Sequence, residues 1–164
     1  MAMVPRELQD LFQAFTTGPT ALREAISGLN AGTMNQRPPG SDWSICDVMH
    51  HLADHELVRA VQVRLVVAAP EPPPLFGYDE AAWQRKLQYL WRSPEAALSL
   101  FDQARYTTAE LLSHCDKAAW ARTGLHAERG PQSVHDLVAS LVRHTAEHVA
   151  QVTEARAALS RPRG

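Results

Sequence analysis

Hydrophobic residues recur along most of the chain at the three- and four-residue spacing of amphipathic helices. The first such run covers residues 6–16, and Gly18-Pro19 is expected to interrupt it. A shorter helix over about 20–29 then precedes a loop over 30–42, which is rich in asparagine, glycine and proline. No segment alternates between polar and apolar residues well enough to predict a strand.

The remainder of the chain is also predicted to be mainly helical. A long helix is expected over residues 43–69, followed by a stiff, proline-rich connection over 70–77. Two helices over 78–92 and 93–114, an irregular segment over 115–131 and a last helix over 134–159 are expected to follow. Two of these helices begin with Ser-x-x-Asp, an arrangement that resembles a capping box. Long helices with short connections in 164 residues predict an all-α fold, an antiparallel bundle forming a single domain over 1–164.

Composition and charge exclude some classes of partner. The chain is 45% hydrophobic and 21% charged, with a net charge of −2, so it has no basic surface suited to nucleic acid or an anionic membrane. The longest apolar stretch, 57–69, contains Arg59 and Arg64 and is too short to span a bilayer. A small-molecule partner is therefore favoured over nucleic acid or membrane.

The cysteines and the N-terminal residues indicate a compartment. Cys46 and Cys115 form neither a disulfide framework nor a C-x-x-C pair, which favours a reducing environment. The first ten residues carry charge and lack the apolar core of a signal peptide. A cytoplasmic location is expected.

Two histidines lie on the core-facing side of the last predicted helix. The stripe that contains them consists of Leu137, Leu141, His144, His148 and Gln151. Because residues four apart project from the same side of a helix, His144 and His148 have the spacing of two ligands on one metal ion. The alternative is that each is a histidine at the core edge with an ordinary hydrogen bond.

A second group of histidines lies in 46-CDVMHHLADHEL-57. Helical phase places His51 and His55 on one stripe, whereas His50 falls on another side beside Asp54. A catalytic metal site with an open position needs three protein ligands, so one of His51 and His55 is expected to join the pair on the last helix. Periodicity does not choose between them.

Three strings occur in order along the chain. In 43-WSICDVMHHLADHEL-57, a tryptophan is followed eight residues later by the motif H-[LIV]-x-D, which here begins at His51. The strings 78-YDEAAW-83 and 144-HTAEH-148 come later. Together, over about residues 5–160, they resemble the DinB-like superfamily and its YfiT-like branch of metal-dependent hydrolases. One departure is Glu147, since the branch often carries a double histidine at this point.

The resemblance implies a four-helix bundle with a metal site in its core. His51, His144 and His148 would bind one divalent ion, zinc or nickel, together with water. The resemblance also implies a homodimer. Some relatives are S-transferases that use a low-molecular-weight thiol such as bacillithiol or mycothiol, so a thiol cosubstrate is expected alongside the small-molecule substrate.

Three neutral imidazoles would leave the charge of the ion acting on its open position, where water or a thiol would lose a proton near neutral pH. Hydrolysis and S-transfer require the same ligands, so both stay open. Asp54, Glu147 and His55 are candidates for orienting the ligands or for proton transfer. The alternative for the two acids is a solvated place on the helix surface.

A non-catalytic bundle is the second class of function. Its metal would be structural, or the protein would bind partners in a stress response. A fourth protein ligand that closes the site, such as His55 or Cys46, would favour this interpretation.

Overall fold

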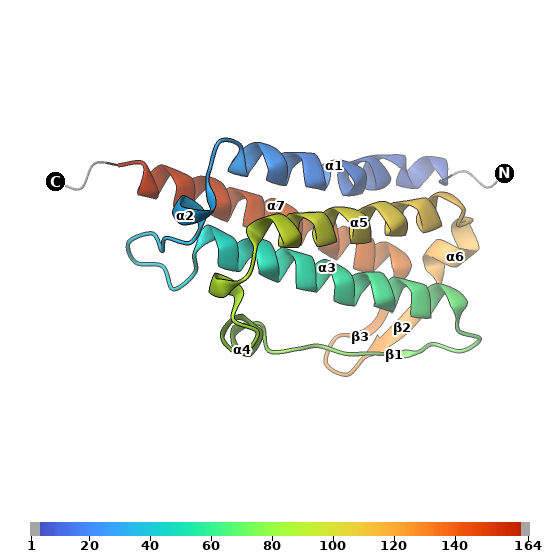
Figure 1. Ribbon diagram of the computed structural model, residues 1–164. Helices are drawn as coiled ribbons and strands as arrows, with labels where there is room; N and C mark the ends of the chain where they lie inside the picture. Colours follow the sequence, from blue (N-terminus) through green and yellow to red (C-terminus); the bar gives the residue numbers. More distant parts are fainter. Residues whose placement is uncertain (1–3, 162–164) are drawn as a thin grey trace.

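The computed structural model describes residues 4–161 and shows four long helices lying side by side (Figure 1). These helices are α1 (Gln9–Ile26), α3 (Ile45–Ala68), α5 (Pro94–Ser113) and α7 (Val134–Leu159). The predicted all-α four-helix bundle is confirmed. Within residues 4–161, no helix is both long enough and apolar enough to cross a membrane.

The helices do not simply alternate in direction. In Figure 1, α1 and α7 run one way while α3 and α5 run the other, and each of these pairs packs side by side. The antiparallel neighbours are α3 with α7 and α1 with α5. This arrangement follows from the connection over 69–93, which runs back along the bundle so that α5 begins at the same end as α3.

Short helices fill the connections. They are the 3₁₀ helices η1 (Arg6–Leu8) and η2 (Tyr89–Trp91) and the α-helices α2 (Ala31–Met34), α4 (Glu80–Lys86) and α6 (Lys117–Ala121). The single helix predicted over 78–92 is therefore two pieces. Gln88 separates them, because its left-handed conformation, with φ of 54°, cannot continue a right-handed helix.

A small sheet lies beside α3 (Figure 1). Its strands β1 (Pro74–Leu75), β2 (Thr123–His126) and β3 (Gly130–Ser133) are ordered β1-β2-β3, with β1 parallel to β2 and β2 antiparallel to β3. The expectation that no segment forms a strand was wrong here, because strands this short that contain glycine and proline carry no alternation signal. Gly124 lets the sheet approach closely, since a Cβ there would lie 2.8 Å from the Leu75 side chain.

The predicted break at Gly18-Pro19 was also wrong, because α1 runs through it. Pro19 has no N–H to donate to the carbonyl oxygen of Phe15, which would leave that oxygen without its helical partner. Arg105 Nη1 donates to this oxygen instead, at 2.7 Å. A Cβ on Gly18 would lie 2.9 Å from the same nitrogen, so glycine leaves room for the guanidinium group.

One arginine contacts all four long helices. Arg105 on α5 donates from Nε and Nη2 to the two carboxylate oxygens of Glu56 on α3, each at 2.8 Å. Its Nη2 also donates to Thr145 Oγ1 on α7 at 2.9 Å, while Phe15 on α1 accepts from Nη1. The Arg105 and Glu56 side chains are each only 1% exposed, so this is a fully buried ion pair.

Apolar residues form one cluster on each side of this polar layer. Phe15, Val63, Val66 and Leu112 belong to one cluster, with Trp120 and the first turns of α7. The other cluster holds Leu22, Ile45, Met49, Leu52 and Phe101.

Both predicted capping boxes are present. Ser44 Oγ accepts from the backbone N–H of Asp47 at 3.0 Å, and Asp47 Oδ2 accepts from the N–H of Ser44 at 2.9 Å. Ser133 and Asp136 make the same pair of bonds at the start of α7. These caps define where α3 and α7 begin, and therefore which way each histidine on them points.

Replacing Glu56 with alanine should lower the free energy of unfolding by about 3–5 kcal/mol, because Arg105 would keep a buried charge without its carboxylate. Urea denaturation followed by circular dichroism measures the change. As a control, Lys117→Ala removes an exposed ion pair with Glu7 and should leave the denaturation midpoint unchanged. A Glu56→Ala variant as stable as the parent would contradict the importance given to this pair.

Candidate metal centre

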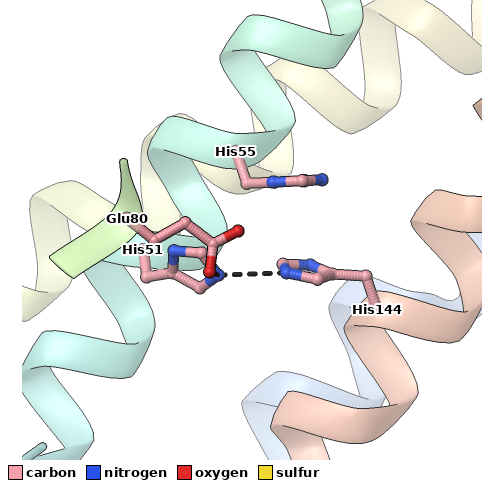
Figure 2. Close-up of side chains that lie close together, drawn as sticks. All are labelled: His51, His55, Glu80 and His144. Carbon is pink, nitrogen blue, oxygen red and sulfur yellow. Dashed lines mark hydrogen bonds and ion pairs between the residues drawn. The ribbon is translucent and has the colours of Figure 1, made fainter. Parts of the chain in front are cut away.

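Histidines of α3 and α7 meet inside the bundle (Figure 2). His51 Nε2 and His144 Nε2 lie 3.0 Å apart. Together with His55 and Glu80 they form a group whose possible ligand atoms all lie within 4.8 Å of one another. Three of these side chains come from α3 and α7, and Glu80 comes from the first turn of α4.

His148 packs against the same group. Its ring centroid lies 4.7 Å from that of His51 and 4.5 Å from that of His144. Its Nδ1 lies 2.7 Å from Gln151 Oε1, one turn further along α7. Because an amide oxygen only accepts, Nδ1 carries the proton and the lone pair is on Nε2, the nitrogen left for a ligand role. The rings of the three predicted ligands thus lie side by side, although His148 is outside the group of ligand atoms within 4.8 Å, which takes in His55 and Glu80.

Both nitrogens of His55 already have partners. Its Nδ1 lies 3.1 Å from Tyr78 Oη, and its Nε2 accepts from Arg59 Nε at 3.4 Å. The ring stacks on His144 with centroids 4.0 Å apart and an interplanar angle of 19°. To bind an ion through Nε2, His55 would have to lose its bond with Arg59, whereas His51 faces His144 directly.

Burial keeps these rings neutral. Removal from water lowers the pKa of His51 to about 4, and the nearby His148 contributes further. Burial, followed by the charge of Arg59, lowers the pKa of His55 to about 3. Burial and His55 likewise lower the pKa of His144. A neutral imidazole is the form that donates a lone pair to a metal, so the cluster is ready to bind one at pH 7.

The residues present fit a divalent ion. Imidazole nitrogens bound to zinc at about 2.0–2.1 Å in a tetrahedral site lie roughly 3.3 Å apart, close to the 3.0 Å between His51 and His144. The half-exposed Glu80 adds a carboxylate oxygen 3.9 Å from His51 Nε2. Imidazole and carboxylate are ligands typical of zinc and similar transition metals, so the cluster can hold a divalent ion.

Sequence reasoning gave no site role to Glu80, although the string 78-YDEAAW-83 was singled out. Asp79 caps α4 by accepting from the backbone N–H of Ala82 at 2.9 Å, which turns the next residue toward the histidines. The sequence signal that could have indicated Glu80 was an acid directly after a helix cap within this string. Tyr78 lies in the same string, and its contact with His55 was also not predicted.

The two predicted catalytic acids lie outside this donor group. Asp54 is buried, not solvated, and accepts from Tyr89 Oη at 2.8 Å with Arg92 Nη1 at 3.6 Å. Glu147 is exposed on α7, and its side chain makes no hydrogen bond or ion pair within residues 4–161. Their proposed catalytic roles stay predictions. His50 stacks on Tyr89, on the same side of α3 as Asp54.

Cys46 does not join the cluster as a further ligand. Its buried thiol lies 3.5 Å from the carbonyl oxygens of Tyr89 and of Arg92, which share its one S–H donor. Burial raises the pKa of this thiol to about 11, so it stays protonated. Among the described residues, the one side chain other than histidine in the group of possible metal ligands is that of the half-exposed Glu80.

Comparison with known proteins reveals relatives of similar length. Residues 14–152 match the model of the DinB superfamily. A protein of Geobacillus kaustophilus, named by inference as a metal-dependent hydrolase, is 28% identical over 151 residues, which are 92% of this chain and 84% of the relative. A second such protein, from Oceanobacillus iheyensis, is 26% identical over 148 residues, covering 90% and 80% of the two chains.

Two solved structures share the fold. YfiT from Bacillus subtilis, described as a probable metal-dependent hydrolase with an unusual four-helix bundle topology, superposes with a TM-score of 0.84 at 21% identity, covering 96% of this chain and 90% of its own. A mycothiol-dependent maleylpyruvate isomerase superposes with a TM-score of 0.73 at 14% identity, covering 93% of this chain and 63% of its own.

The buried histidines should make the stability of the metal-free protein depend on pH. Unfolded histidines take up protons below about pH 6.5, whereas His51, His55 and His144 resist protonation while folded. The free energy of unfolding should therefore be highest above pH 6.5 and fall toward pH 4, by up to about 1.4 kcal/mol per pH unit for each histidine.

Urea denaturation in EDTA at a series of pH values measures this slope. A His55→Asn variant should show a smaller slope than the parent, and the exposed control His135→Asn should show the same slope. Equal slopes in the parent and the His55→Asn variant would contradict burial of a neutral ring.

Proposed function

The chain belongs to the DinB superfamily, and from this membership and its histidine cluster we propose that it is a metal-dependent enzyme. His51, His144 and His148 would hold the ion, zinc or nickel. The observation that carries the proposal is the meeting of His51 Nε2 and His144 Nε2 at 3.0 Å, against a third ring whose Nδ1 is held by Gln151. Once bound, such an ion lowers the pKa of a water or thiol at its open position.

Neighbouring side chains orient the proposed ligands. Gln151 holds the proton of His148 on Nδ1. The Trp43 ring meets His51 edge-on, with centroids 5.4 Å apart, and limits its rotation. His55 stacks on His144 and is itself held by Tyr78. Ligand rings held in this way need little reorganisation before the reaction.

Glu80 is the acid placed for proton transfer. Its carboxylate lies 3.9 Å from His51 Nε2 while its side chain is half exposed. It can therefore take a proton from a water or thiol that approaches the histidines and pass it to solvent. This role supplements those predicted for Asp54, which faces Tyr89 and Arg92, and for Glu147, which is exposed on α7.

The substrate is proposed to be a small molecule, attacked either by water or by a low-molecular-weight thiol. Relatives named as metal-dependent hydrolases support the first, and the fold shared with a mycothiol-dependent isomerase supports the second. A surface cleft of about 200 Å³ is lined in part by Trp43 and Gln151, whose side chains separate it from His51 and His148, and no histidine of the cluster lines it. We further propose that the protein forms a homodimer. We also propose that it is cytoplasmic, in keeping with the free thiols of Cys46 and Cys115.

Metal content tests the ligand set. The purified protein should contain about one zinc or nickel ion per chain by elemental analysis, and His148→Ala and His144→Ala should each lose it, because two imidazoles hold an ion far less tightly than three. His135→Ala, which changes an exposed histidine of the same helix, should keep the ion. Stoichiometric metal in the His148→Ala variant would overturn the assignment.

Activity tests the role of Glu80. The protein should catalyse conjugation of bacillithiol or mycothiol with monochlorobimane, or hydrolysis of an ester or amide panel, and chelation should abolish the reaction. Glu80→Gln should lower kcat by about 10²-fold or more with metal content unchanged. Glu110→Gln, which changes an exposed acid of α5, is the control and should keep the parental kcat. Equal kcat in Glu80→Gln and the parent would exclude proton transfer by Glu80.

A further inference from the structure

Arg59 is a buried arginine without a carboxylate partner. It lies one turn beyond His55 on α3 and is only 8% exposed. Among residues 4–161, no carboxylate oxygen lies within 4.0 Å of its guanidinium nitrogens. The other buried arginine, Arg105, has both oxygens of Glu56. A buried charge usually has a partner of opposite charge, so Arg59 is an exception that needs a cause.

Neutral groups hold the Arg59 guanidinium in place. Its Nε donates to His55 Nε2 at 3.4 Å, and its Nη1 donates to Gln62 Oε1 at 2.7 Å. Gln62 is fixed in turn by donating to the carbonyl oxygen of Phe76 at 2.7 Å. Nη2 makes no hydrogen bond within the described chain and is not sealed from solvent, so one edge of the group is free to donate.

The surroundings of Arg59 carry excess positive charge. Burial, followed by the charge of Arg129, lowers the pKa of Arg59, whereas Tyr78 and Glu80 raise it, so the exposed Arg129 lies near the Arg59 guanidinium. Its turn is held in place by His126 Nδ1, which accepts from the backbone N–H of Arg129 at 3.3 Å. The nearest acid, Glu80, faces His51 and makes no ion pair with either arginine. The ion proposed above would add further positive charge.

We propose that Arg59, assisted by Arg129, binds a carboxylate of the substrate or of the thiol cosubstrate. This inference rests on the proposed function, because it assigns the chemical class of the molecule that reacts beside His51 and His144. The planar guanidinium matches a carboxylate with two parallel hydrogen bonds. A carboxylate suits this place better than a phosphate, since the positive charges of Arg59 and Arg129, less the negative charge of Glu80, balance a single charge and not two.

The position also limits the shape of the molecule. Arg59 Nε lies 3.4 Å from His55 Nε2, and the His55 ring stacks on His144 with centroids 4.0 Å apart. One imidazole ring therefore separates the guanidinium from the nearest proposed ligand, so a carboxylate on Arg59 would be a few bonds away from the atom that reacts at the histidines. Arg59 would hold the molecule without taking part in the bond changes, which makes it a positioning residue.

Direct binding tests the inference independently of turnover. Isothermal titration calorimetry with sodium succinate, on protein as purified and again after EDTA treatment, should detect binding in both. Succinamide, which has the same carbon chain without charge, should not bind. Arg59→Gln should weaken succinate binding at least about tenfold, and Arg59→Lys should weaken it less, since lysine keeps the charge but not the planar pair of donors. Arg129→Gln should show a smaller loss than Arg59→Gln.

The matched control is Arg64→Gln. Arg64 is a half-buried arginine of the same helix that donates to Thr108 Oγ1 on α5, away from the histidines, and its loss should leave succinate binding unchanged. Circular dichroism confirms that each variant is folded.

Three results would overturn the inference. These are unchanged succinate affinity in folded Arg59→Gln, tighter binding of inorganic phosphate than of succinate, and succinate binding that disappears after EDTA treatment, since the carboxylate would then sit on the ion. Failure of the proposed enzyme would appear separately, as absent metal or absent turnover with succinate binding intact.

Discussion

The buried ion pair between Arg105 and Glu56 sets the arrangement on which the histidine cluster depends. Glu56 directly follows His55 on α3, and Thr145, which also accepts from Arg105, directly follows His144 on α7. A single guanidinium therefore holds the rotation of both helices at the level of the histidines. Arg105 Nη1 also donates to the carbonyl oxygen of Phe15, so α1 is held at the same level.

This polar layer has an energetic cost that the apolar clusters on either side must offset. Burying an ion pair gains little net stability, because desolvation of the two groups cancels most of their attraction. What the pair supplies is a preference for one register of the four helices, since any rotation would leave a charge unpaired. The imidazoles of His51, His55 and His144, packed together beside this layer, add to the cost, and they stay neutral because burial lowers the pKa of each.

Local pattern predicted much of this molecule. The spacing of apolar residues located α3, α5 and α7 and the two halves of α1, and Ser-x-x-Asp located the starts of α3 and α7. The histidine pair on α7 was found because residues four apart share a face. The strands and the continuity of α1 were not, since each depends on a distant partner. Pro19 is tolerated only because Arg105, far along the chain, donates to the oxygen that proline leaves free.

The sequence by itself determined which residues form helices and which face of each helix carries histidine, because both follow from local periodicity. Periodicity left His51 and His55 equivalent, and the resemblance to the DinB-like superfamily favoured His51. Only the tertiary structure shows the surroundings of the two rings, with Tyr78 and Arg59 at the two nitrogens of His55 while His51 faces His144 on α7. The placing of Glu80 and the unpaired charge of Arg59 also depend on segments that are distant in sequence or lie in different elements. No local pattern records such contacts, since they arise only when the helices pack.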